Sequence, residues 1–542
     1  MKKLIVLVVV GLCLNQSFAG GLLTNGNQSA QYIRMLSRNA STDVDAVYFN
    51  PAGLMKMENG FYFAIQNQSL YQTKSVQSGF PLLNTGKYDG MLSADIFPTA
   101  YAVYKKDRVA FSLGLGPNSG GGSADFDKGL PSFEKEISTL PPNLAELSKL
   151  GMNVQGYNVD LSFNGKSVYW GIQGGVSVKI NEIFSVYGGL RYVPATNKYF
   201  GYLKNISLNV NGTVKNAASF LSGDVTNVLH GLAAQAVGGA ASVQPLITAG
   251  AGSYPLAVIE GAGYISTAQR TQIEQGLMQL TGLSQAQINE MTVSQIQKAF
   301  NAGAASLNGK AAQMTAVAGT LGDKLVDVTQ TGGGITPIVG VNISPAKNLN
   351  IGLKYEFMTK LTLQNNTKVD GTGLFPDKKK TGSDVPALFS VGADYKVSKF
   401  NFSASFNHYY DKGVDWGMNI YDEPRVINHN TWEVALGTKY QLVKKLALSV
   451  GYLRTNMGVY PQFQSDFSFY NNTADTFGGG FEFKLTSKLT ADAGVIYTKY
   501  KDAQKTFQAA TYNSYTSPIY NETYSKHNLG FAIGLCYHVG GL

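Results

Sequence analysis

The chain has 542 residues and a formal net charge of +9, and it is rich in Gly (61), Tyr (31) and Phe (28) although only 15% of its residues are charged. Its basic residues are scattered and do not cluster with aromatic residues, which argues against a nucleic-acid-binding protein. Tyr and Phe suit strands and membrane interfaces, and Gly suits barrel bends. The composition therefore favours an all-β transmembrane protein over a series of soluble domains.

Residues 1–19 have the pattern of a secretory signal peptide, in which lysines precede an apolar run at 4–14 and small residues precede a cleavage site after Ala19. The apolar run is shorter than the roughly 20 residues that a transmembrane helix needs. We therefore expect an exported mature chain. After cleavage it would retain one cysteine, Cys536, and so no intrachain disulfide.

Alternating apolar and polar residues predict fourteen strands. The clearest run is 349–363, where the odd positions, through Leu361 and Leu363, are expected to face lipid and the even positions to face the lumen. The predicted strands cover 60–74, 92–104, 108–116, 167–180, 183–211, 334–344, 349–363, 385–397, 400–410, 431–442, 446–457, 476–485, 489–501 and 526–539. An even number of strands allows a closed antiparallel barrel, which leaves no unpaired edge in lipid.

The connections between these strands alternate between short and long, as in outer-membrane barrels. The short turns cover 105–107, 181–182, 345–348, 398–399, 443–445 and 486–488. By this asymmetry the short turns and both termini are expected on the periplasmic side. The predicted localisation is the bacterial outer membrane.

One long connection, roughly 212–332, changes to helical periodicity. Three successive capping boxes predict short packed helices rather than a disordered insertion. The boxes pair Ser266 with Gln269, Ser284 with Gln287, and Thr292 with Gln295. A smaller Gly-rich loop is expected at 117–165, with an amphipathic stretch at 140–150.

Residues 20–59 precede the first strand and are too polar and broken to form a barrel strand. They contain enough apolar residues to pack, and a barrel of fourteen strands has a lumen wider than its own side chains can fill. We therefore expect an N-terminal hatch, or plug, at 20–59. The expected organisation is a 14-stranded antiparallel outer-membrane β-barrel over 60–542, closed by this hatch and carrying the helical extracellular insertion.

The segment 39–54 reads Asn-Ala-Ser-x-x-x-x-Ala-x-x-x-Asn-Pro-Ala-Gly-Leu. Together with the paired-strand pattern and the Pro386-Ala387 start of the eighth strand, it resembles the FadL/TodX family of outer-membrane transporters of long-chain fatty acids or aromatic hydrocarbons. The resemblance covers essentially the whole mature chain. It implies a passive channel whose ligand enters an apolar groove among the extracellular helices, moves to a lumen pocket and leaves sideways beside the hatch.

In that family the sideways exit lies at a kink in the third strand. The corresponding residues here are Gly114, Gly116 and Pro117, which are suited to breaking ladder pairing, although the same residues can simply end a strand. The resemblance also implies that the hatch and gate segment includes Asn50-Pro51-Ala52. The long connection after the fifth strand departs from the fatty-acid members and leaves the identity of the ligand open.

A fatty acid needs a dry apolar slot for its tail and a cation for its carboxylate. The candidate cations are Arg191 and Lys360, which have lumen parity, and Lys198, whose parity requires a bulge at Pro194. Lys198 and Lys360 also fall near positions where family members place basic ligand residues. The alternative for each cation is an ion pair with a lumen acid such as Glu356.

We expect no enzymatic activity, no cofactor and no metal site, because the five histidines have no ligand spacing and no nucleophile–base set is visible. The expected partners are a long-chain fatty acid or another hydrophobic small molecule and outer-membrane lipid, with no nucleic acid and a monomeric state. The alternative function is a surface adhesion or interaction protein that acts through the helical insertion. A barrel hydrolase is the third reading, and haem is a further possible cargo.

Overall fold

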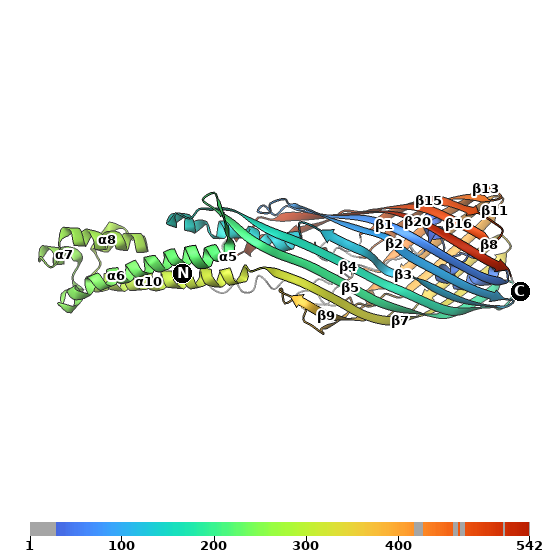
Figure 1. Cartoon of the computed structure of the whole chain (residues 1–542), viewed down its shortest axis with the longest axis horizontal. Coiled ribbons are helices and arrows are strands. Elements are labelled where there is room, and N and C mark those ends of the chain that lie inside the picture. The colour runs from blue at the N-terminus through green and yellow to red at the C-terminus, as the bar shows by residue number, and fades with distance from the viewer. Residues whose placement is uncertain are drawn as a thin grey trace.

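The computed structural model describes residues 29–416, 427–458, 464, 466, 472–512 and 515–540, so the expected signal peptide at 1–19 lies outside the described residues. The main sheet closes on itself because β20 pairs with both β1 and β16. The result is a closed antiparallel barrel with helices projecting from one end (Figure 1).

Fourteen wall strands form this barrel, as the sequence predicts. Three wall strands consist of two segments each, since β9 continues β8, β11 continues β10 and β17 continues β16. The segments are β1 (Gly60–Ser78), β2 (Lys87–Lys106), β3 (Val109–Phe126), β4 (Val154–Lys179), β5 (Phe184–Val210), β7 (Lys324–Ala346), β8 (Leu349–Glu356), β9 (Thr362–Asp370), β10 (Lys380–Gly382), β11 (Leu388–Val397), β12 (Phe400–Tyr409), β13 (Trp432–Val443), β14 (Leu446–Asn456), β15 (Ala474–Lys484), β16 (Leu489–Tyr500), β17 (Ala503–Phe507) and β20 (Tyr520–Gly540). β6 (Thr213–Asn216) extends β5 as a hairpin, and β18 (Thr511–Tyr512) pairs only with β19 (Tyr515–Thr516).

The outer wall is an apolar band. Side chains on this face are large and exposed, for example Ile65 at 65%, Val450 at 64% and Ile533 at 66%. The residues next to these three along each strand point inward and are polar or small: Ala64 and Gln66, Ser449 and Gly451, Ala532 and Gly534. A surface of this kind is stable only against lipid, and a closed barrel satisfies every backbone group within the bilayer. The protein is therefore an outer-membrane β-barrel.

Several strands extend further toward the long-loop end than the sequence predicts. β2, β4, β7 and β20 begin five or more residues earlier than expected, and β3 runs to Phe126 instead of ending at 116. The loop that we expected at 117–165 is therefore shorter at both ends, because β3 and β4 take up its first and last residues. Above the bilayer neither face of a strand contacts lipid, so the apolar alternation that marks a membrane strand stops while backbone pairing continues.

The prediction of one unbroken strand at 349–363 is also wrong. β8 ends at Glu356 and β9 begins at Thr362, and the odd residues change sides across the break. Leu361 and Leu363 do not face lipid; both are 2% exposed and pack against Tyr169 inside the barrel. The alternation rule fails here because an interruption of the ladder resets the parity of the side chains.

The described part of the hatch, from residue 29 to 59, lies inside the lumen. It contains α1 (Ala30–Met35), α2 (Ala46–Phe49) and the 3₁₀ segment η1 (Pro51–Lys56). Every residue of α1 is buried, and α1 contacts β1, β13, β14, β15, β16 and β20. The hatch therefore fills the barrel interior, as the sequence suggests.

The helical insertion projects from the end of the barrel opposite the C-terminus (Figure 1). All three predicted capping boxes are present, at the starts of α8, α9 and α10. Its elements are α5 (Ala217–Ser219), the π segment η3 (Phe220–Val225), α6 (Thr226–Thr248), η4 (Ala251–Ser253), α7 (Leu256–Gly261), α8 (Thr267–Thr281), α9 (Gln285–Asn289) and α10 (Val293–Thr320). Among the described residues, none of the helices combines the length and hydropathy needed to cross a bilayer.

Shorter helices occupy the connection between β3 and β4. These are α3 (Pro131–Ser138), α4 (Leu140–Asn143) and η2 (Ala145–Leu150), and a further 3₁₀ turn, η5 (Asp411–Gly413), follows β12. α3 lies over the long-loop end of the barrel, where Lys135 Nζ contacts Glu522 Oε1 at 2.5 Å. The helices of this loop therefore cover the wall strands and do not project from them.

Candidate functional site

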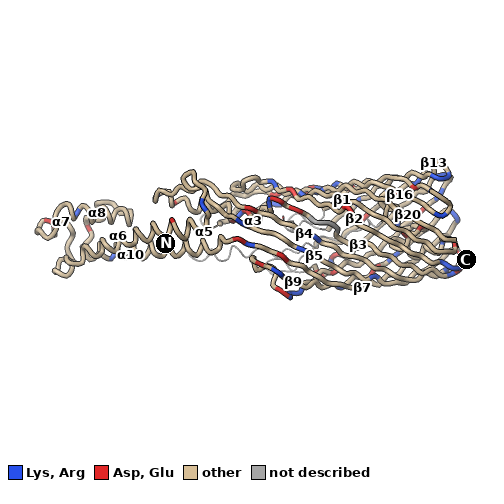
Figure 2. The backbone as a smooth tube through the Cα atoms, in the orientation of Figure 1, with Lys and Arg blue, Asp and Glu red and all other residues tan. Residues whose placement is uncertain are grey.

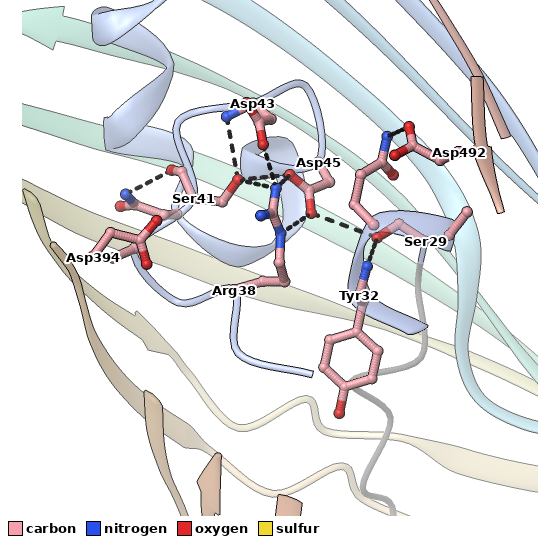
Figure 3. A network of polar contacts seen from close by, with 12 residues as sticks. Ser29, Tyr32, Arg38, Ser41, Asp43, Asp45, Asp394 and Asp492 are labelled. Atoms are coloured by element: carbon pink, nitrogen blue, oxygen red, sulfur yellow. Dashed lines mark hydrogen bonds and ion pairs between the residues drawn. The ribbon is translucent and has the colours of Figure 1, made fainter. Parts of the chain in front are cut away.

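A buried charge network holds the hatch in its own fold (Figure 3). The guanidinium of Arg38 donates to both carboxylate oxygens of Asp45 at 2.7 Å and to Asp43 Oδ2 at 2.7 Å. Ser41 Oγ accepts from Arg38 at 2.8 Å and donates to Asp45 Oδ1 at 2.6 Å. Bidentate contacts of this kind fix geometry as well as charge, so the turn between α1 and α2 is rigid.

A second arginine fastens the hatch to the barrel wall. Arg34 on α1 is fully buried and lies 2.9 Å from Asp492 Oδ1 on β16 and 2.8 Å from Glu482 Oε2 on β15. Gln31, one turn earlier, donates to Asp492 Oδ2 at 2.8 Å. Removing one partner of such a buried pair leaves an uncompensated charge. These contacts therefore stabilise the position of α1 against β15 and β16.

The predicted gate residues Asn50, Pro51 and Ala52 are fixed to another part of the wall. Asn50 donates its side-chain amide, whereas Pro51 and Ala52 accept at their backbone oxygens. Their wall partners are Asn342 on β7 at 2.8 Å, Ser177 on β4 at 2.7 Å and Ser185 on β5 at 2.7 Å. This segment of the hatch is therefore tied to three strands.

The ladder between β2 and β3 is interrupted. Pairing runs from the short turn up to Ala100 opposite Leu115 and resumes at Ser93 opposite Ser123. Residues 94–99 of β2 and 116–122 of β3 lie between the two paired stretches. β3 thus has one residue more than β2 over this interval, which is the signature of a bulge.

The predicted kink residues lie at this interruption. Gly114 lies in the paired stretch next to the short turn. Gly116 and Pro117 are the first residues of the unpaired stretch that follows. β3 does not end there, as one alternative reading of the sequence held, because it stays paired with β4 and shifts register after Pro117 and again after Gly120. Pro donates no backbone hydrogen bond, and Gly120 has a φ of +70°, so both residues suit a distorted strand.

A small cavity of about 10 Å³, close to the size of one water molecule, lies on the lumen side of this interruption. Its lining includes Val47 and Tyr48 of the hatch, Tyr101 of β2, Leu115 of β3 and Arg191 of β5. A groove of about 560 Å³ lies on the outer face, with an almost entirely apolar lining that includes Leu113. Tyr101 and Leu115 line both spaces, so the lumen cavity and the lipid-facing groove lie on opposite sides of the same stretch of wall.

A second small cavity in the lumen, of about 20 Å³, is also lined by Tyr48. Aromatic residues of the hatch, Tyr32, Tyr48 and Phe49, form part of its lining together with Tyr409 and Glu433 of the wall. The rings of Tyr32 and Phe49 stack at 5.4 Å. Tyr48 therefore lines both lumen cavities.

The cations near these cavities are ion-paired. Arg191 is 2% exposed, lies 2.5 Å and 3.0 Å from the two carboxylate oxygens of Glu356, and also donates to Gln173. Lys354 lies 2.6 Å from Glu356 Oε1 and donates to the backbone oxygen of Tyr48 at 2.8 Å. Both cations also lie 4.7 Å from the centroid of the Tyr48 ring. Two cations therefore share one carboxylate beside the cavities.

Lys354 is missing from the ligand residues proposed from the sequence, although strand parity places it in the lumen. Its spacing from Glu356 could have identified it, because residues two apart on a strand lie on the same face. Arg191 comes from a distant strand. Its approach to this pair depends on the register of β5, β7 and β8, which no local pattern encodes.

The other two proposed cations are not beside Arg191. Lys198 is exposed on the same outward parity as Phe200, because β5 pairs without the bulge that we expected at Pro194. Lys360 lies in the break between β8 and β9, where its ammonium is 2.9 Å from Asp384 and its side chain is 71% exposed. The lumen parity expected for both residues is therefore wrong.

An apolar cleft of about 70 Å³ lies near the long-loop end, between α3 and the upper parts of β4, β5 and β7. Phe133, Leu203 and Phe375 contribute to its lining, and its acidic and basic residues are Glu136 and Lys324. Burial raises the pKa of Glu136 to about 7, against the opposing effect of the Lys324 charge. The cleft therefore favours a neutral acid at this position.

The cleft is expected to loosen as Glu136 ionises. Because the folded-state pKa lies above the ordinary value of 4.5, the stability that the group contributes is fully present below about 4.5 and is lost as the pH rises through about 7. Hydrogen exchange of α3, corrected for its intrinsic pH dependence, should show an opening equilibrium that rises by up to roughly a hundredfold over this range. Glu136→Gln should remove the dependence, whereas Glu146→Gln, at an exposed site, should retain it. If Glu136→Gln kept the same pH profile, the Glu136 carboxyl would not be the group that controls the opening of α3.

Within the part of the chain that the structure describes, no three His, Cys, Asp or Glu side chains gather in a way that could hold a metal ion. The cavities instead combine apolar and aromatic walls with a few buried charges. This arrangement is suited to holding a hydrophobic molecule in an orientation set by one polar end.

Solved structures share this architecture. A Pseudomonas aeruginosa FadL homologue aligns over 95% of this chain and 99% of its own, with a TM-score of 0.55 and 12% sequence identity. The Pseudomonas putida toluene transporter TodX aligns over 95% and 99%, with a TM-score of 0.50 and 11% identity. No family model and no curated protein sequence matches the chain. The chain therefore has the fold of the FadL/TodX family, an outer-membrane β-barrel of fourteen strands closed by an N-terminal hatch.

Proposed function

We propose that the protein is a passive channel that takes up hydrophobic molecules through the outer membrane. The observation that carries this proposal is the series of cavities that share lining residues. Tyr48 lines both lumen cavities, and Tyr101 and Leu115 line both the inner cavity and the outer groove. The lumen cavities are close to the size of a water molecule, so the side chains that line them must move apart for a ligand to pass. A ligand on this route stays out of bulk water, which favours apolar solutes by about 0.8 kcal/mol for each buried CH₂.

The exit is proposed to be lateral. The hatch fills the lumen and is fastened to the wall by Arg34 and by Asn50-Pro51-Ala52, so the barrel axis is blocked. The interruption between β2 and β3 lies beside the inner cavity, at Gly116 and Pro117. Small displacements of Tyr101 and Leu115 would open the cavity toward lipid, where an apolar ligand is stable. The apolar cleft beneath α3 is proposed as the first binding site.

The proposed ligand is a long-chain fatty acid. Arg191 and Lys354 share the single carboxylate of Glu356, so a ligand carboxylate beside them would compensate the remaining positive charge. The aromatic walls around Tyr48 would accommodate the alkyl chain. TodX is described as a toluene transporter, and an uncharged aromatic hydrocarbon is the competing ligand class.

Mass spectrometry of small molecules that co-purify with the detergent-extracted protein tests the ligand class. We expect fatty acids to be retained, and titration with a long-chain fatty acid should show saturable binding that weakens in Lys354→Gln. Retention of only neutral aromatic compounds would favour the competing class. The absence of both kinds of molecule, together with no binding in the titration, would refute the transport proposal.

Filling the inner cavity should stop uptake without unfolding the barrel. A Cβ at Gly114 would lie 3.0 Å from Val47 Cγ1 and 3.4 Å from Tyr101 Cδ1, so Gly114→Leu places its side chain in the route. Uptake of a labelled hydrophobic substrate by intact cells should fall to the level of cells that lack the protein. The matched control is Gly188→Leu on the outer face of β5, where a Cβ meets nothing within 4 Å. Equal uptake by the two variants would contradict the route.

A further inference from the structure

The short-turn end of the barrel is strongly basic, and Figure 2 shows Lys and Arg gathered around it. Its exposed cations are Lys56, Lys106, Arg108, Lys347, Lys396, Lys399, Lys444, Lys445, Lys484 and Lys488. Its exposed acids among the described residues are Glu58, Asp107 and Glu182. A rim with this excess of positive charge attracts anionic groups that lie at the membrane surface.

The lipid-facing groove reaches this rim. Its floor contains Ala100 and Ala102 of β2, and its sides contain the larger exposed side chains of Phe63, Ile65 and Leu113. The small alanines between bulky neighbours leave a channel that is apolar throughout. Such a channel on the lipid-facing surface fits an acyl chain.

The lower end of the groove lies at the membrane interface. Leu489, which follows the turn between β15 and β16, and Tyr537 both line it. Tyr537 is 43% exposed, and the rings of Phe61 and Tyr104 stack at 4.4 Å near the same end. Exposed aromatic residues of this kind form the interfacial girdle of outer-membrane barrels. The groove therefore runs inward from the headgroup level.

Two cations flank that lower end. Ala100, Ala102 and Lys106 share one face of β2 because side chains alternate along a strand. The six steps from Ala100 to Lys106 span roughly 20 Å along the tilted strand, or about one leaflet of the bilayer. Lys488 lies on the other side, directly before Leu489. Within the described residues neither ammonium forms an ion pair.

We propose that this face binds an anionic phospholipid of the periplasmic leaflet. The phosphate lies between Lys106 and Lys488, and one acyl chain occupies the groove over Ala100 and Ala102 as far as Leu115. Binding of the lipid does not require the channel to transport anything. If the lateral exit operates as proposed above, this acyl chain covers its outer end, and a departing ligand enters the membrane alongside it.

Native mass spectrometry of the full chain tests the proposal after reconstitution in nanodiscs that contain equal amounts of phosphatidylglycerol and phosphatidylcholine. We expect retained phosphatidylglycerol to exceed phosphatidylcholine. The double variant Lys106→Gln/Lys488→Gln should lose this preference, by roughly fivefold for each cation removed. The matched control Lys399→Gln/Lys445→Gln removes the same charge from other turns. It should retain as much phosphatidylglycerol as the unmodified protein.

The groove is tested separately from the charges. Ala100→Leu/Ala102→Leu fills the floor and should release the lipid, whereas Ala393→Leu/Ala404→Leu, on the facing residues of β11 and β12, should not. Equal retention of both lipids by the unmodified protein, or equal losses in a test variant and its control, would overturn the proposal. Because the readout is bound lipid, its failure is distinguishable from a failure of uptake.

Discussion

Replacing Arg34 with methionine is expected to release the hatch from the wall while the barrel remains closed. Arg34 is fully buried and contacts Asp492 and Glu482, which belong to two different strands. Its removal leaves Asp492 without a cation, whereas Glu482 keeps Lys439 at 3.2 Å, and breaking a buried pair in this way costs about 3–5 kcal/mol. The barrel closes through backbone pairing that does not involve Arg34. The lost free energy therefore weakens the packing of α1 in the lumen and not the barrel itself.

Hydrogen exchange and limited proteolysis of residues 29–59 measure this effect, and leakage of a polar dye from proteoliposomes measures whether the lumen has opened. The matched control is Arg454→Met. Arg454 pairs with Asp475 at 2.6 Å, but both side chains are more than a third exposed, and such pairs contribute about 0–1 kcal/mol. If hatch exchange is the same in both variants, the Arg34 contacts do not hold the hatch.

A valine at Gly478 is expected to prevent the hatch from seating, whereas a valine at the next residue, Gly479, is tolerated. A Cβ at Gly478 would overlap the backbone oxygen of Ile33, which cannot move without displacing α1. At Gly479 the nearest atom is Ser449 O at 3.7 Å. Overpacking of this kind costs about 1–3 kcal/mol when flexible side chains can yield, and backbone yields less readily.

This site belongs to a row of glycines along which the hatch runs. Gly437, Gly451 and Gly478 are paired across β13, β14 and β15, and a Cβ at either of the first two would collide with Met35 O. The same assays of exchange and dye leakage apply. Heat-resistant barrel formation shows whether each variant has folded. A folded Gly478→Val with a protected hatch would contradict the proposed role of the row.

Strand number, wall orientation and helix caps follow from the sequence alone. Each depends on local spacing, as in the three Ser/Thr-x-x-Gln boxes, whose partners lie three residues apart. The lipid-facing alternation is equally local, since neighbouring residues on a strand face opposite sides. The sequence also placed Arg191 on the lumen face, and the structure agrees. The placement of residues 29–59 in the lumen follows from the lack of any other space for an apolar segment.

Register and loop packing decided what the sequence could not. Lys360 faces outward because the ladder breaks between β8 and β9, and Lys198 does so because β5 has no bulge at Pro194. The sharing of Glu356 by Arg191 and Lys354 depends on three strands meeting in one register. The cavities beside Gly114 and Tyr101 form between segments far apart in the chain. Composition and periodicity describe only a residue's own neighbours, so these contacts appear only when the barrel closes around its hatch.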